Sequence, residues 1–162
     1  MAARRRLDRR VRAEQLALRH AVRLGHLRES ARRRRYVGRA ESEDFRRWTP
    51  VEPILRPHLD DPPSWDIYTN ARTCYPDLPE YHLMFPFLYR RLTQTSEVHL
   101  YTSLNGIYWD RVPGGPVLEP GDPGSWNGEF IVAGKQLVPL GNDTIAIPLS
   151  ASTHPHKYPR WP

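Results

Sequence analysis

Two similar stretches of sequence decide the fold of this chain: residues 42–48, Ser-Glu-Asp-Phe-Arg-Arg-Trp, and residues 103–109, Ser-Leu-Asn-Gly-Ile-Tyr-Trp. Each begins with a serine, has an aspartate or asparagine two residues later, and ends on a tryptophan. Asn105-Gly106 is the strongest short signal for a β-hairpin turn, because both residues accept a left-handed backbone. Asp44 suits the same turn, since Asp and Asn form the same local hydrogen bonds. Each stretch therefore predicts a polar turn between antiparallel strands.

The two turns belong to a longer repeat with a period of 61 residues. When residues 37–66 are laid over residues 98–127 without gaps, eight of thirty positions are identical. The identical pairs are Val37/Val98, Ser42/Ser103, Trp48/Trp109, Val51/Val112, Asp61/Asp122, Pro62/Pro123, Ser64/Ser125 and Trp65/Trp126. Self-similarity at a fixed period indicates a repeat architecture. We interpret the repeated tryptophans as packing residues.

Proline and glycine punctuate the chain from residue 36 onward. The 17 prolines and 10 glycines among 162 residues exclude a helix bundle for the main body. Turn residues recur every 6 to 12 positions between short apolar runs, which is typical of an all-β sandwich, barrel or propeller. In addition to the strands that flank the two turns, we expect strands at residues 67–69, 82–88, 98–102, 130–133, 136–139 and 144–149.

The repeat favours a β-propeller whose blades are residues 37–97 and 98–158. Closure by radial repetition needs at least about four blades. We therefore predict an all-β, partial propeller of about two blades within residues 36–162. Further C-terminal blades or an oligomer would complete it.

The positive charge of the chain is confined to one end. Residues 1–48 hold sixteen arginines and six carboxylates, a net charge of +10, whereas residues 49–162 carry −4. One approximate helical stripe holds Leu7, Val11, Leu18 and Val22. This spacing predicts a basic N-terminal α-helix, or a poorly ordered extension, over residues 1–35. The arginines suit nucleic-acid phosphates or an anionic surface, but we prefer a solubilising extension.

Little in the sequence suggests a metal site or a membrane protein. Cys74 is the single cysteine, so it has no internal disulfide partner, and no metal-type Cys/His spacing is present. No apolar run approaches the ~18 residues of a membrane span. Residues 16–27 are interrupted by Arg and His where a signal peptide is continuously apolar. We expect no metal, no cofactor and no transmembrane segment, and we assign a cytoplasmic location only by default.

Several stretches resemble bacterial proteins of the five-bladed β-propeller glycosidase superfamily. They are residues 36–48, 66–70, 82–86, 102–109, 124–127 and 155–160. That superfamily includes β-fructosidases and arabinanases of glycoside hydrolase families 32 and 43, and the chain is most similar to uncharacterised relatives described as family 32 N-terminal-like. The resemblance implies a five-bladed propeller and a carbohydrate substrate. The superfamily's Trp-x-Asn-Asp-Pro and Arg-Asp-Pro motifs are absent from this sequence.

The resemblance also implies catalytic carboxylates near the starts of inner strands, one as general acid and the other as base or nucleophile. Asp66 occupies that position in the first copy, whereas its equivalent, Asn127, cannot act as an acid or base. Glu129 follows two residues later on the same strand face and is the candidate second carboxylate. The alternatives are a turn or cap role for Asp66 and a solvated surface position for Glu129.

Candidate substrate-binding residues accompany these carboxylates. Alternation places Asp66, Tyr68 and Asn70 on one face of a strand. Their carboxylate, aromatic ring and amide suit sugar hydroxyls and an apolar sugar face; a strand-end cap beside a buried tyrosine is the alternative. Asn127 joins this set, and the resemblance adds His156 and Lys157.

We therefore expect a glycoside hydrolase-like protein that cleaves O-glycosidic bonds by carboxylate acid/base chemistry. The first alternative is a non-catalytic glycan-binding or structural propeller fragment. The second is nucleic-acid or anionic-surface binding through the arginine-rich N-terminus.

Overall fold

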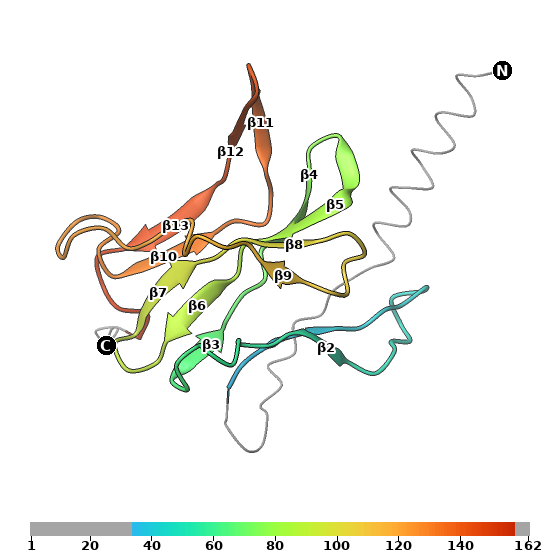
Figure 1. Cartoon of the computed structure of the whole chain (residues 1–162), viewed down its shortest axis with the longest axis horizontal. Helices are drawn as coiled ribbons and strands as arrows, with labels where there is room; N and C mark the ends of the chain where they lie inside the picture. The colour runs from blue at the N-terminus through green and yellow to red at the C-terminus, as the bar shows by residue number, and fades with distance from the viewer. Residues whose placement is uncertain (1–33, 158–162) are drawn as a thin grey trace.

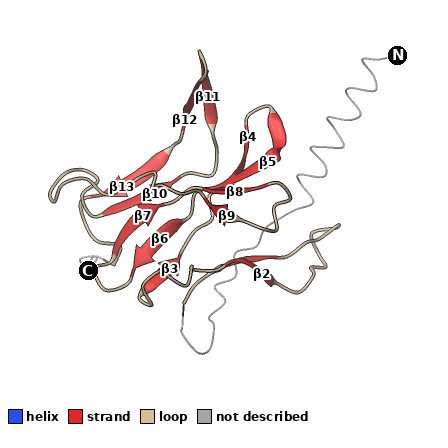
Figure 2. Ribbon diagram, in the orientation of Figure 1, coloured by secondary structure: helices blue, strands red, loops and turns tan. Residues whose placement is uncertain are grey.

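The computed structural model describes residues 34–157, and this part of the chain is all-β, with thirteen strands and no helix (Figures 1 and 2). The helix predicted within residues 1–35, and with it the arginine-rich interface, lies outside the described residues except for Arg34 and Arg35. The strands are β1 Val37–Arg39, β2 Glu52–Leu55, β3 Trp65–Ile67, β4 Arg72–Tyr75, β5 Leu78–Met84, β6 Phe87–Arg90, β7 Thr95–Val98, β8 Tyr101–Ser103, β9 Asp110–Arg111, β10 Phe130–Ala133, β11 Val138–Gly141, β12 Thr144–Ala146 and β13 Leu149–Ser152.

The strands form five small antiparallel sheets within the described residues, and each sheet is open at both edges. One sheet has four strands in the order β4-β5-β8-β9, and another has three in the order β3-β6-β7. The remaining sheets are the pairs β1-β2, β10-β13 and β11-β12, the last of which projects from the body as a hairpin (Figure 1). Strand β10 also packs beside β7.

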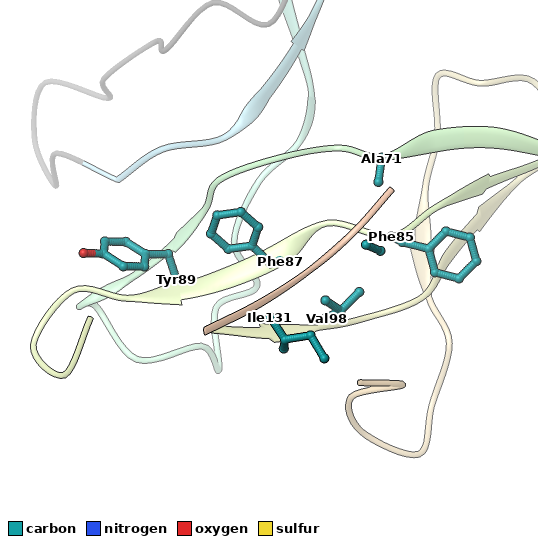
Figure 3. Packing of buried hydrophobic residues seen from close by; sticks show 7 residues of the cluster. Ala71, Phe85, Phe87, Tyr89, Val98 and Ile131 are labelled. Carbon is teal, nitrogen blue, oxygen red and sulfur yellow. The ribbon is translucent and has the colours of Figure 1, made fainter. Parts of the chain in front are cut away.

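The two largest apolar clusters lie on opposite faces of β6. Phe87 and Tyr89 belong to a cluster that includes Val98 and Ile131, and Figure 3 shows these side chains along β6 and its neighbours. Leu88, between them in sequence, packs in the second cluster. Successive side chains of a strand point to opposite faces, so β6 supplies both clusters and is buried on both sides.

Three of the strands expected from sequence are each divided in the structure. The expected strand 82–88 is split between β5 and β6, 98–102 between β7 and β8, and 144–149 between β12 and β13. In all three cases the chain leaves one sheet and enters another. The first two breaks meet, because the N–H of His99 donates to the carbonyl of Pro86 (3.1 Å). Pro86 has no N–H and cannot continue a central ladder, which explains why the first strand stops there. The expected strand 130–133 is confirmed as β10.

The two polar turns have the same hydrogen-bond pattern. Asp44 Oδ1 accepts the N–H groups of Arg46 and Arg47, both at 2.8 Å. Asn105 Oδ1 accepts the equivalent N–H groups, those of Ile107 (2.9 Å) and Tyr108 (3.0 Å). In each turn the serine hydroxyl also donates to that oxygen, at 3.2 Å.

The backbone of the two turns is equivalent as well. The residue after the capping oxygen is left-handed in both copies, with φ of 58° at Phe45 and 69° at Gly106. Glycine adopts this conformation without the steric cost that a side chain brings, so the second copy is the less strained. The tryptophans differ more: Trp65 and Trp109 pack against the second cluster, whereas Trp126 is mostly exposed.

A bidentate ion pair joins the connection of the first copy to the hairpin of the second. Arg111 donates to both oxygens of Asp61, at 2.8 and 2.7 Å, and its Nε donates to Tyr101 Oη at 2.7 Å. Asp61 is buried. Burial raises the pKa of Asp61, but the hydrogen bonds from Arg111 and from the His58 N–H outweigh burial and lower it. The pair therefore holds Asp61 ionised inside the protein.

We predict that Asn105→Ala lowers the free energy of unfolding by about 1 to 2 kcal/mol, because two turn N–H groups lose their acceptor. Asn105→Asp keeps an acceptor of the same shape and is expected to change stability by less than about 0.5 kcal/mol. Urea denaturation measures both. Equal losses in the two variants would contradict the capping role of the side-chain oxygen.

We predict that Arg111→Met destabilises the protein by about 2 to 4 kcal/mol, since it leaves a buried carboxylate without its partner. Arg46→Met, at an exposed turn position, is the matched control and is expected to cost less than about 0.5 kcal/mol. Thermal and urea unfolding compare them. Similar stabilities for the two variants would show that the Asp61–Arg111 pair contributes nothing to folding.

Candidate functional site

Strand β3 and the residues after it direct side chains alternately to the two faces of the three-stranded sheet. Ile67 packs in the second cluster, and Tyr68 packs against the first. Asp66, on the same side as Tyr68 by alternation, is buried. The face expected to carry sugar-binding side chains is therefore the face of Phe87 and Tyr89.

Tyr68 lies at the centre of a group of aromatic rings, which we call the Tyr68 site. Its ring stacks on Phe87, with centroids 5.0 Å apart, and meets Tyr89 edge-on at 5.5 Å. The imidazole of His156 also meets it edge-on, at 5.1 Å. Phe130, at the start of β10, completes the group by stacking on His156 at 4.9 Å and contacting Phe87 edge-on. Four separate segments of the chain thus supply one aromatic surface.

His156 reaches this surface from the far end of the described residues. Its backbone N–H donates to the Gln94 carbonyl (3.1 Å), and its Nε2 is hydrogen-bonded to Tyr68 Oη (3.3 Å). The residue is exposed to solvent although its ring touches Tyr68, Tyr89 and Phe130. Burial of the ring, followed by the charges of Arg35 and Lys157, lowers the pKa of His156. A neutral imidazole can both donate and accept a hydrogen bond.

Arg35 covers the other side of Tyr68. Its guanidinium carbon lies 4.3 Å from the centre of the Tyr68 ring, in cation–π geometry. The backbone N–H of Arg35 donates to Asp66 Oδ1 at 3.0 Å. Asp66 is also 3.9 Å from Arg91 Nε. The carboxylate predicted to be catalytic therefore holds the segment that carries Arg35 against the sheet.

Two buried polar atoms of this region, Arg35 Nη1 and Tyr89 Oη, make no hydrogen bond within residues 34–157. A buried polar atom without a partner costs about 1–3 kcal/mol, so such atoms in native proteins are usually satisfied by water or a ligand. Burial, followed by the neighbouring Tyr68, raises the pKa of Tyr89. Its hydroxyl therefore keeps its proton and is available as a donor.

The other predicted site residues take no part in the ring contacts described above. Asn70 is buried, and its Oδ1 accepts the Arg72 N–H at 3.4 Å, which is the strand-end role given above as its alternative. Asn127 Oδ1 accepts the Ser125 hydroxyl at 3.1 Å within a local turn. Lys157 is exposed, and its N–H donates to Gln94 Oε1.

Glu129 precedes Phe130, and its backbone N–H donates to the Ser152 carbonyl at 3.2 Å. Within the described part of the chain, no hydrogen bond or ion pair connects its carboxylate with Asp66. The structure thus brings together Asp66, Tyr68 and His156 of the predicted residues, and it leaves Asn70, Asn127, Glu129 and Lys157 outside the ring contacts.

Four members of the site are not predicted from the sequence: Arg35, Phe87, Tyr89 and Phe130. The alternation of apolar residues along 87–89 would have placed Tyr89 beside Phe87. Arg35 was indistinguishable in sequence from the arginines that precede it. Among residues 34–157, no group of three or more His, Cys, Asp or Glu side chains is arranged to hold a metal ion. No helix in the described part is long and apolar enough to cross a membrane.

Comparison with known proteins gives one informative similarity. No family model and no curated protein matches this sequence. The fold is similar to that of an N-acetylgalactosamine deacetylase from F. plautii, whose crystal structure was solved in complex with blood group B trisaccharide. The TM-score is 0.57 at 22% sequence identity, over 72% of this chain and 32% of the deacetylase chain. The present chain thus matches about a third of that protein, and the likeness is one of fold.

We predict that the imidazole of His156 titrates with a midpoint below 6.5, the value of an unperturbed histidine. Because the unfolded chain then takes up the proton first, this group stabilises the fold above about pH 6.5 and the contribution is lost as the pH falls through the folded pKa. An NMR titration, with the resonance assigned by its absence in His156→Gln, measures the midpoint. A midpoint at or above 6.5 would contradict the packing described for this ring.

Proposed function

We propose that this chain binds a glycan at the Tyr68 site. The proposal rests on one observation. The rings of Tyr68, His156 and Phe130 contact one another on a partly exposed surface, and the guanidinium of Arg35 lies over the Tyr68 ring. Sugars present apolar C–H faces that stack on aromatic rings, and hydroxyls that need both donors and acceptors. The exposed, neutral imidazole of His156 supplies such a group.

The fold also supports a carbohydrate-binding role. We propose that the described sheets are part of a propeller-type domain of the five-bladed glycosidase type, completed by further chain or by a second copy. The repeated turns and the open sheets are consistent with two incomplete blades. The similar deacetylase is a carbohydrate-active enzyme crystallised with a trisaccharide, and this chain matches 32% of it.

Glycoside hydrolysis is a further step that we propose only for a completed protein. Asp66 lies beside Tyr68 in sequence, but it is buried and its carboxylate accepts the Arg35 N–H. An acid/base pair in a glycosidase must flank the scissile bond, with carboxylates about 5–10 Å apart. In the described part of the chain, no hydrogen bond or ion pair joins Glu129 to Arg35 or Arg91, the residues that interact with Asp66. Binding therefore has more support than cleavage.

The binding proposal is tested with four sugars: blood group B trisaccharide, N-acetylgalactosamine, arabinobiose and sucrose. The first two follow from the similar deacetylase, and the last two from the glycosidase resemblance. We expect saturable binding of at least one sugar by isothermal titration calorimetry. His156→Ala is expected to weaken it about tenfold, because the imidazole edge and its hydrogen bond are lost.

His154→Ala is the matched control, since His154 is an exposed histidine two residues away, and its backbone N–H donates to Ser152 Oγ at 3.0 Å. It is expected to leave the dissociation constant unchanged. Absence of binding for all four sugars, or equal weakening by both substitutions, would reject the Tyr68 site as a glycan site.

Hydrolysis is tested separately with aryl-glycoside substrates and with arabinan. If the two carboxylates act as predicted, Asp66→Asn and Glu129→Gln each lower turnover at least about a hundredfold. Equal turnover in the wild type and both variants would remove these residues from any catalytic role while leaving the binding proposal intact.

A further inference from the structure

A concave surface lies on the four-stranded sheet, and its lining shares no residue with the Tyr68 site, although Leu83 also packs against the first apolar cluster. It is an open groove of about 510 Å³. Its lining includes Tyr81, Leu83, Thr102, Leu104, Tyr108 and Asp110. No hydrogen bond or ring contact joins these side chains to Tyr68 or His156 within the described residues. We call this surface the Tyr81–Tyr108 groove.

The strand register explains why these side chains share one surface. Leu83 of β5 is paired with Thr102 of β8, and Thr102 is paired with Asp110 of β9. Paired residues in an antiparallel sheet project to the same face, and residues two apart on a strand do so as well. Tyr81 and Leu104 therefore lie on the same face of the sheet as Leu83 and Thr102. His82, between Tyr81 and Leu83 on β5, also lines the groove, and its Nδ1 is 3.3 Å from Cys74 Sγ.

Two tyrosine side chains of the groove are largely exposed to solvent. Tyr81 is 50% exposed and Tyr108 is 77% exposed. Tyr108 is nevertheless held in place at its backbone, because its N–H donates to Asn105 Oδ1 at 3.0 Å in the polar turn. A ring on a fixed backbone loses less conformational entropy when a ligand binds it.

Polar groups accompany the rings. Asp110 is exposed, and its carboxylate makes no hydrogen bond or ion pair with any residue in the described part. Thr102 carries its hydroxyl beside it, as the paired residue on β8. A protein docked here would bury the Asp110 carboxylate, which is costly without a cationic partner. A sugar would instead donate its hydroxyls to that carboxylate.

We propose that the Tyr81–Tyr108 groove is a second glycan-binding site, one that seats a single sugar ring against the two tyrosines with its hydroxyls directed to Asp110 and Thr102. A volume of about 510 Å³ lies within the usual range for small-ligand sites. The choice of a glycan as ligand rests on the proposed function, but the location does not depend on the Tyr68 site.

The test uses the full chain labelled with 3-fluorotyrosine and titrated with the same four sugars, observed by ¹⁹F NMR. Single Tyr→Phe variants assign the resonances of Tyr68, Tyr81 and Tyr108. We expect the Tyr81 and Tyr108 resonances to shift together in a saturable way with at least one sugar. Tyr108→Ala is expected to weaken the response of Tyr81 about tenfold.

Tyr75→Ala is the matched control, because Tyr75 is also an exposed tyrosine of this sheet, at 44%, but does not line the groove. Asp110→Asn keeps the shape of the side chain and removes its charge, and it is expected to weaken binding without unfolding the exposed strand. Weakening by Tyr75→Ala to the same extent as by Tyr108→Ala would overturn the proposal.

The two sites can fail independently. Shifts at Tyr68 alone would overturn the groove and leave the proposed function standing. Shifts at Tyr81 and Tyr108 alone would support the groove and contradict the Tyr68 site. No shift at any tyrosine would overturn both, and shifts that follow protein dilution but not sugar would identify the groove as a self-association surface instead.

Discussion

The burial of β6 on both faces is the constraint on which the rest of the structure depends. This short strand lies between β3 and β7, and it sends Phe87 and Tyr89 to one cluster and Leu88 to the other. Burying a side chain of this size contributes roughly 1.5–3 kcal/mol. A shift of one residue in register would exchange the two faces, so the pairing of β6 fixes both cores at once.

The Tyr68 site is a consequence of that pairing. Tyr68 stacks on Phe87 and meets Tyr89, and both of those residues belong to β6. His156 and Arg35 approach from opposite ends of the described chain and contact the same ring. Asp66 secures the Arg35 backbone, and Gln94 secures that of His156. The site therefore forms only when the three-stranded sheet is folded.

The sequence predicts the local features of this protein better than the long-range ones. The polar turns follow from Ser42, Asp44, Ser103 and Asn105. The side chains of Asp44 and Asn105 accept backbone N–H groups two or three residues away, and each serine hydroxyl donates to the same oxygen. Alternation and the resemblance predict Tyr68 and His156 as site residues, and the structure brings them into contact.

Features that depend on distant partners could not be predicted in this way. The change of sheet at Pro86 requires the carbonyl of that residue to meet the N–H of His99, which a strand pattern does not encode. Arg35 gains its place from a ring more than thirty residues away. Glu129 has the right spacing on its strand, but its neighbours are set by the pairing of β10 with β13.

The most direct measurement of the central claim is a crystal structure of the full chain with a bound sugar from the four tested. The account predicts a sugar ring against Tyr68, Phe130 and His156, with a hydroxyl near Arg35; a sugar bound with that surface left empty would contradict it.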